Sequence, residues 1–511
     1  MPSPYHGIRP PYTLPSDVVF FHDWRYVDTG SFSWQDENGH GLGIFTDCPA
    51  PPMHLVHHHI PHGVRIAAQP ATVGDPVISS GADRIYLFPG SMIHDGGVYR
   101  LWLESWPREH IASGKCGAYN DLRYFESDDG VEWRAPEIGR IERDGNRRNN
   151  IVYGGDARPD SVGFHGGCVF LDPSAPPTER YKAWHLGNAT QEMKAAYLAR
   201  RPNDADKNHL GVKNPAGLFA ATSPDGLDWS PIPEPMVLQH SDTQNVCTYD
   251  TVTRKYVAYC RSWFFGRRTI GRMESDEFRD FPLPEELFWP DASMDPSELW
   301  YNNAKTIMPG TVDYHLMFPM RWSLSTDRFD FHMASSPDGI VWNKVPDGPV
   351  CEPGDPGSWN EGVVVPGVGL VELPGHRTGL LIQGARIPHK YPRNPPVGEL
   401  AWAWWPKERL VALEAEREGA FSLWPLRVTG RAVELNASTH FTGFVQVEAC
   451  DQGGKPLPGR SFEDCDPVHG DELARTVTWR GQSDLCLTEG SVVILRFRMR
   501  AAKLFSARFV S

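Results

Sequence analysis

The stretch SSPDGIVW, residues 335–342, decides the fold of this chain because it is repeated. Related stretches stand at three more places: SDDGVEW at 127–133, SPDGLDW at 223–229 and a worn version, SDEF, at 275–278. Four related turns at intervals along one chain indicate a repeat architecture.

Each complete copy combines three residue types with separate mechanical roles. The Asp accepts hydrogen bonds from backbone N–H groups of its own turn, the Gly adopts a positive φ, and the Trp falls on the next strand, where it packs. We therefore interpret three acidic residues as turn-forming rather than catalytic: Asp129, Asp225 and Asp338.

Three strand-like segments precede each turn in a constant order. An inner segment rich in small residues is followed by an aromatic middle segment and an alternating outer segment, as in SMIHDG, YRLWLES and LRYFE at 91–126. With an edge strand after the turn, this order predicts a four-stranded antiparallel blade. Five such units span about 80–412, and a short helix is predicted at 407–416.

The sequence predicts an all-β protein with a five-bladed β-propeller followed by a C-terminal β-sandwich. Residues 1–79 are expected to pack on or close the propeller, which occupies 80–415 and carries the active site. From 416 to 511 the pattern changes to short alternating strands separated by Gly/Pro turns, which is typical of a β-sandwich.

Composition excludes several classes of protein. A formal charge of −14 over 511 residues repels nucleic acid, and no apolar run is long enough to span a membrane. Nine cysteines stand singly without a C-x-x-C pair, and the prolines beside the histidines at 54–62 mark a loop, so no metal is expected. With no signal segment, we expect a cytoplasmic protein without a cofactor, and a homo-oligomer stays open.

Inner strands of a propeller converge, so residues at their N-terminal ends are expected to share one face. Three of these positions carry carboxylates, namely Asp242, Glu298 and Glu361, and the second unit contributes Asp160 and His165. Like charges gathered in a pocket cost stability unless they are used, which suits acid/base catalysis. The alternative is that each is a turn-capping or surface carboxylate.

The second strand of each blade returns its C-terminal end to the same face. Around that mouth we expect Glu104, Trp106, His185, Arg261, Trp263, Arg321, Trp322, Gln383 and Arg386. Rings that stack on sugars and guanidinium groups that bind hydroxyls or carboxylates make a carbohydrate surface. The predicted substrate-binding residues are His165, Asp160, Arg261, Trp263, Tyr301, Asn302, Arg321, Trp322, Trp359 and Asn360.

The repeated SPDG…W turns and the segments FLDPSAPPTERYKAW and SDTQNVCTYDTVTRKYVAYCR resemble five-bladed β-propeller glycoside hydrolases of families 32, 43 and 68. The order of a propeller and a sandwich over about 80–511 is similar to family 32. The chain departs from that family in its motifs: no N-D-P-N-G-like strand, R-D-P or E-C is present. The resemblance implies a glycosidase, and relatives that hold a calcium on the axis leave a structural calcium open.

Our first hypothesis is a glycoside hydrolase acting on an oligosaccharide or polysaccharide, with furanosides among the candidate substrates. Glu298 is assigned as general acid, Asp242 as nucleophile or base, and Glu361 as the supporting carboxylate. The alternatives are a non-catalytic carbohydrate-binding propeller, and a glycoside phosphorylase or lyase using Arg261, Arg321, His165 and Tyr301.

Overall fold

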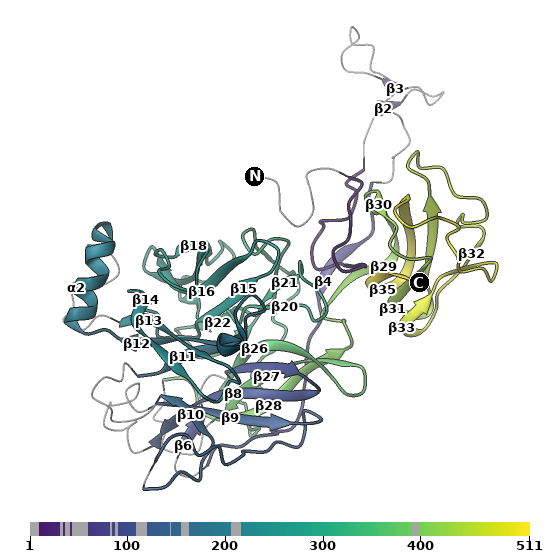
Figure 1. Cartoon of the computed structure of the whole chain (residues 1–511). Coiled ribbons are helices and arrows are strands. Elements are labelled where there is room, and N and C mark those ends of the chain that lie inside the picture. The colour runs from purple at the N-terminus through teal and green to yellow at the C-terminus, as the bar shows by residue number, and fades with distance from the viewer. Residues whose placement is uncertain are drawn as a thin grey trace. The chain divides into compact units, whose positions relative to one another are not determined.

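The computed structural model describes residues 10–30, 34–35, 41–42, 60–81, 84–86, 90–108, 120–143, 145–154, 163–205, 216–390 and 398–511. The chain divides into two compact units. Unit 1 comprises Met1–Gln69, Val345–Asp347 and Glu408–Ser511, and unit 2 comprises Pro70–Lys344 and Gly348–Lys407. Strands dominate both units, which confirms the all-β class (Figure 1).

Unit 2 is built from antiparallel sheets whose strands follow one another in chain order. The first group is β7 (Ser91–Asp95), β8 (Val98–Pro107), β9 (Asp121–Ser127) and β10 (Ile151–Gly154), with β6 (Arg84–Tyr86) beside β8. The second group is β11 (His165–Leu171), β12 (Tyr181–Asn188), β13 (Ala216–Ser223) and β14 (Ser230–Val237). The third group is β15 (Val246–Asp250), β16 (Lys255–Phe264), β17 (Arg267–Ser275) and β18 (Glu285–Phe288).

The next strands are divided between two sheets. One sheet holds β20 (Thr306–Ile307), β21 (His315–Met317), β24 (Ala334–Ser336) and β25 (Asn343–Lys344), and another holds β19 (Glu298–Trp300), β22 (Met320–Ser323) and β23 (Arg328–Phe331). We refer to these strands together as the fourth group. The fifth group is β26 (Val363–Leu373), β27 (Arg377–Ala385), β28 (Glu399–Pro406) and β5 (Thr72–Val73).

The aspartate–glycine turns form as the sequence predicts. In the turn after β13, the N–H groups of Leu227 and Asp228 donate to one oxygen of Asp225 at 2.8 and 2.9 Å. The N–H of Gly226, at φ +79°, donates to the Ser223 hydroxyl at 2.9 Å. The same bonds form around Asp129 and Asp338, so all three carboxylates serve their own turns.

The glycine carbonyl of each turn also joins two strand groups. The carbonyl of Gly226 accepts the indole N–H of Trp229 in its own turn at 3.0 Å and that of Trp102 on β8 at 2.7 Å. Gly130 accepts from Trp133 and from Trp402 on β28. Gly339 accepts from Trp342 and from the Tyr259 hydroxyl on β16. Each turn is thus joined to a strand of another group.

The worn copy at 275–278 has no glycine, and no such bond forms there among the described residues. Trp184 on β12 occupies the place that Trp102 holds on β8, and it packs against Phe278 and Phe281, with ring centroids 6.2 and 4.8 Å apart. Its indole N–H has no hydrogen-bond partner among the described residues. The third group therefore joins the second through aromatic packing.

The helical content differs from the prediction. Residues 407–416, predicted as a helix, contain the start of β29 (Val411–Ser422), because this segment pairs with β4 (Arg65–Ala68) and β35 (Val492–Val510). One helix of the described chain, α2 (Gln191–Arg200), lies in the insertion after β12, with two 3-10 turns at Pro177–Glu179 and Pro202–Asp204. No described helix is long and apolar enough to cross a membrane.

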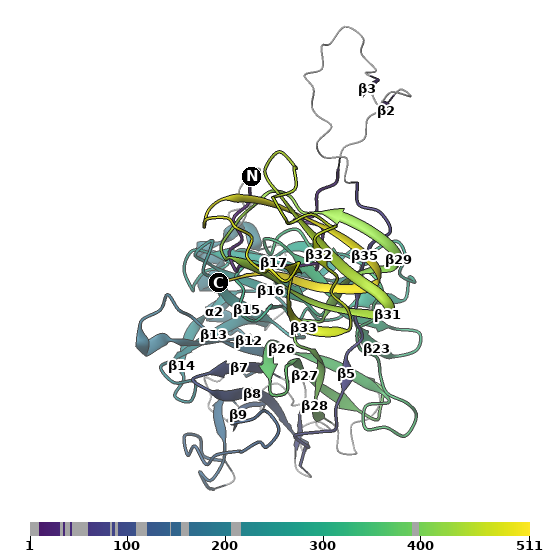
Figure 2. The same ribbon diagram turned by 90° about the vertical axis from the view of Figure 1, so that its right-hand side faces the viewer.

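Unit 1 combines the two ends of the chain. Its main sheet has the order β33 (Asp471–Thr476), β31 (Ala432–Cys450), β35, β29 and β4, with β1 (Val18–Phe20) and β30 (Leu426–Arg427) also paired to β35. Figure 2 shows the long strands β31 and β35 beside each other. Two small pairs complete the strands: β2 (Trp34–Gln35) with β3 (Gly41–Leu42), and β32 (Cys465–Asp466) with β34 (Thr478–Trp479).

The division into units differs from the predicted boundaries of 1–79, 80–415 and 416–511. Residues up to 69 group with the C-terminal strands, because β1 and β4 pair with β35 and β29. Only the short strand β5 joins unit 2, where it forms the edge of the fifth group beside β28. Pairing between strands that are far apart in the sequence cannot be predicted from local sequence patterns.

The seven described cysteines are free thiols, and six of them are buried. Burial raises the pKa of Cys168 to about 12 and that of Cys465 to about 11, so both thiols stay protonated at neutral pH.

Replacing Gly226 with Ala should destabilise unit 2 more than a positive φ alone explains. An added Cβ would lie 2.5 Å from the Trp102 ring, whereas at Gly310, with a similar φ of +75°, it meets nothing within 4 Å. We expect Gly310→Ala to lower the free energy of unfolding by about 1 kcal/mol, and Gly226→Ala by roughly 1–3 kcal/mol more. Equal losses in denaturant unfolding would contradict the interlocking role of the turn.

Candidate functional site

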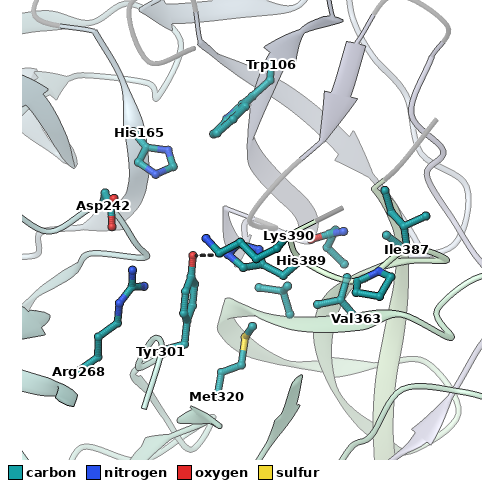
Figure 3. Close-up of a pocket in the computed structure, with 14 residues that line it drawn as sticks. Trp106, His165, Asp242, Arg268, Tyr301, Met320, Val363, Ile387, His389 and Lys390 are labelled. Carbon is teal, nitrogen blue, oxygen red and sulfur yellow. Dashed lines mark hydrogen bonds between the residues drawn. The ribbon is translucent and has the colours of Figure 1, made fainter. Parts of the chain in front are cut away.

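A cavity of ≈ 180 Å³ lies in unit 2 at the N-terminal side of several inner strands. It is lined by Trp106, His165, Asp242, Arg268, Tyr301, Met320, Val363, Val365, Gln383, Ala385, Ile387, Pro388, His389 and Lys390 (Figure 3). Three predicted site residues, His165, Asp242 and Tyr301, are therefore brought together. Trp106 and Gln383, expected at the mouth, line the same cavity.

A buried carboxylate organises one wall of the cavity. Glu104 on β8 is 2% exposed and accepts four hydrogen bonds. The donors to one oxygen are the Trp106 indole at 2.6 Å, the Asn120 amide at 2.8 Å and the His165 ring at 2.9 Å. The N–H of Gly166 donates to the other oxygen at 2.6 Å. Glu104 thus fixes Trp106 and His165, which both line the cavity.

His165 carries a positive charge more readily than an ordinary histidine. Burial alone would lower its pKa, but the Glu104 carboxylate, the charge of Asp242 and a hydrogen bond to the Asp242 backbone together raise it above 6.5. A charged ring donates from both nitrogens, so His165 links the buried carboxylate to the Asp242 segment.

The backbone around Gly166 fixes the same segment. Asn245 donates its N–H to the Gly166 carbonyl at 2.6 Å, and its side-chain amide bonds the carbonyls of Ser241 and Thr243. Gly166 has φ +56°, and a Cβ there would lie 1.8 Å from the Thr243 carbonyl oxygen. Only glycine permits this approach, which holds residues 241–245 against the start of β11.

Asp242 pairs with a buried arginine. The Arg261 guanidinium on β16 donates to one Asp242 oxygen, while 46% of the Asp242 side chain remains exposed. The His240 ring lies 3.9 Å from the other oxygen. One carboxylate oxygen of Asp242 is therefore bonded to Arg261, while the side chain stays partly open to the cavity.

Aromatic rings and cations form another part of the cavity lining. Arg268 on β17 lies over the rings of Trp263, Tyr301 and Trp322, with its central carbon 5.6, 4.8 and 5.5 Å from their centroids. Trp263, predicted to bind substrate, is 43% exposed. Trp322 is buried and packs edge-on against Tyr301 at 5.5 Å.

Two cavity residues come from a loop that the repeat pattern does not mark. His389 bonds the Tyr301 hydroxyl through Nε2 at 3.2 Å, as Figure 3 shows, and the Lys390 ammonium lies 5.1 Å from the Trp322 ring centroid. Neither was predicted, and nor was Arg268, which lies on an outer strand. The basic residues of IPHK at 387–390 were the available signal.

Glu298 and Arg321 contact each other, and neither lines the described cavity. Their side chains are 3.4 Å apart, and Arg321 forms a two-point bond with Asp330 at 3.1 and 2.5 Å. Glu298 also accepts the N–H of Asp295 at 3.1 Å. Among the described residues, Glu298 is not part of the cavity lining, so its role as general acid stays a prediction.

The segment WNEG, residues 359–362, precedes β26 and contains three of the predicted site residues. Glu361 accepts the N–H of Gly357, and Asn360 is buried and accepts the Ser358 hydroxyl at 3.1 Å. Trp359 packs on Gly384 of β27. None of the three is among the lining residues of the described cavity.

Two further residues were predicted to bind substrate, Asn302 and Asp160. Asn302 is buried, and both polar atoms of its side chain are without a hydrogen-bond partner within the described chain. Asp160 lies outside the described residues, as does the histidine run at 54–59. In the described part of the chain no three His, Cys, Asp or Glu side chains gather to hold a metal ion.

No protein-family model matches the chain, and no curated protein matches it. Among solved structures, it is similar to a Bombyx mori family 32 beta-fructofuranosidase at 8% identity and a TM-score of 0.42, over 87% of this chain and 94% of that one. It is similar to the catalytic domain of a Coprinopsis cinerea family 62 alpha-L-arabinofuranosidase at 11% identity and 0.41, over 66% and 97%.

A Listeria innocua beta-1,2-mannobiose phosphorylase is similar at 12% identity and a TM-score of 0.39, over 71% of this chain and 95% of that one. All three matches have low identity and TM-scores below 0.5.

The Glu104–His165 pair should make stability depend on pH. Because the folded pKa of His165 is raised, its stabilisation is complete below the unfolded value of about 6.5 and is lost as pH rises through the folded pKa. The difference in unfolding free energy between the wild type and His165→Gln should therefore be larger at pH 5.5 than at pH 9. The exposed His94, changed to Gln, is the control; a difference independent of pH would contradict the pairing.

Proposed function

We propose that the protein is a carbohydrate-active enzyme that cleaves a glycosidic bond in the cavity of unit 2, with Asp242 at the reacting bond. The observation that carries this proposal is the environment of Asp242. It is the only carboxylate among the described lining residues, its base is held by Arg261, and nearly half of its side chain is open.

The proposal for the fold is a five-bladed propeller in unit 2 and a β-sandwich in unit 1. Its support is a series of bonds between the innermost strands of successive groups. Val169 donates to Ser91 at 2.8 Å, Asn245 to Gly166 at 2.6 Å, Ala304 to Gln244 at 2.9 Å and Leu370 to Thr306 at 3.1 Å. The series closes where Val368 of β26 meets Ser91 of β7. A closed ring gathers the strand starts at one mouth.

Asp242 suits the role of base or nucleophile. A carboxylate can take a proton from water or attack the anomeric carbon. In hydrolysis the glycosidic C–O bond breaks, a water oxygen becomes bonded to the anomeric carbon, and the leaving oxygen gains a proton. Glu298 as the acid and Glu361 as the supporting carboxylate complete the proposal.

The alternatives differ in what the cavity must supply. A binding propeller needs the aromatic walls and no reactive carboxylate. A phosphorylase needs cations that hold phosphate, and a lyase needs a base such as the Tyr301–His389 pair. Arg268 and Lys390 favour the phosphorylase as second candidate, because they bring two cations to the same cavity as Asp242.

Asp242→Asn should lower kcat/KM on a cleaved glycoside by about 10²–10⁴-fold, because the amide cannot accept the proton. The measurement is release of the aryl group from a panel of aryl glycosides that includes fructosides and arabinosides. Asp276→Asn, at a side chain 85% exposed, is the matched control and should retain full turnover.

Glu298→Gln and Glu361→Gln in the same assay test the remaining roles. A loss as large as that of Asp242→Asn supports each assignment, and unchanged turnover removes it. If the Asp242 variant keeps wild-type turnover, the central proposal fails. Glycan binding that persists in all three variants, with no turnover by the wild type, would establish the binding propeller instead.

A further inference from the structure

We propose that the cavity contains an oxyanion subsite, built on Arg268, that takes a carboxylate or phosphate group. The inference rests on the proposed function, since it specifies the chemistry of the ligand at the same site. A uronic acid residue of the glycoside and free inorganic phosphate are the two sources of such a group.

Among the described residues, Arg268 has no carboxylate partner. Its guanidinium lies among the rings of Trp263, Tyr301 and Trp322, and its Nη1 is buried with no hydrogen-bond partner in the described part of the chain. A buried donor left unbonded costs free energy. Ring stacking fixes the plane of a guanidinium and leaves its N–H edge for an acceptor.

Two neighbouring cations have carboxylate partners: Arg261 is paired with Asp242, and His165 with Glu104. Because Arg261 already balances Asp242, that carboxylate does not compensate Arg268. The charge of Arg268 is therefore available to a ligand.

A second positively charged residue, Lys390, lines the same cavity. Burial and the nearby charge of Arg268 both lower the pKa of Arg261, against the opposing effect of Asp242. A bound anion would relieve the repulsion between the two guanidinium groups, in a chain whose formal net charge is −14.

The two sources of the anion give different chemistry. A uronic acid carboxylate on Arg268 would orient the glycoside for hydrolysis. Phosphate would itself replace water: one of its oxygens bonds to the anomeric carbon as the glycosidic C–O bond breaks, and the leaving oxygen takes a proton from an acid. Both use the planar, two-point geometry that guanidinium offers to oxyanions.

The test is calorimetric titration of the full chain with inorganic phosphate, with glucuronate and galacturonate, and with neutral glucose. At least one anion should bind more tightly than glucose, and Arg268→Gln should weaken that binding by about 10- to 100-fold. Arg268→Lys, which keeps the charge and loses the fork, should weaken it less. The exposed Arg328, changed to Gln, is the matched control and should bind like the wild type.

The outcomes separate the sources and the two proposals. Phosphate binding with phosphate-dependent release of a sugar phosphate identifies the first source; uronate binding with turnover of uronosides identifies the second. Anion binding that depends on Arg268 without any glycoside turnover supports the subsite and removes the proposed function. Absence of anion binding, or binding unchanged in Arg268→Gln, overturns the subsite even if neutral glycosides are cleaved.

Discussion

The glycine carbonyl of the aspartate–glycine turn is the point on which unit 2 depends. At Gly226 it receives one indole N–H from its own turn and another from Trp102 of the preceding strand group. The turn itself needs Asp225 to satisfy the backbone and glycine to hold φ +79°. One short motif therefore closes a hairpin and joins two sheets, and where the glycine is missing, at 275–278, the Trp184 indole makes no such bond within the described chain.

Joining the sheets at their outer turns fixes the innermost strands, and these strands build the site. Gly166 brings the start of β11 against the segment that carries Asp242. Glu104, buried behind both, holds His165 and Trp106 by hydrogen bonds of 2.9 and 2.6 Å. The open face of Asp242 is thus positioned by groups from three successive strand groups. Buried polar groups that are fully bonded make such a wall rigid.

Charge is distributed unevenly across this cavity. The wall that carries His165 and Asp242 is balanced by Glu104 and Arg261, so its charges cancel in pairs. The wall that carries Arg268 is built from aromatic rings, which accommodate a guanidinium without neutralising it.

The sequence by itself determined the all-β class, the turns and the order of inner, middle and outer strands, because these follow from local chemistry and alternation. It also predicted His165, Asp242 and Tyr301, which lie at the start of β11 or in the segments just before β15 and β20, where counting repeats can locate them. Only the tertiary structure decided that β1 and β4 belong with the C-terminal strands, that Glu104 lies behind His165, and that Arg268 faces the cavity. These depend on pairing across long stretches of chain and on the direction of side chains on outer strands, and neither is encoded in local pattern.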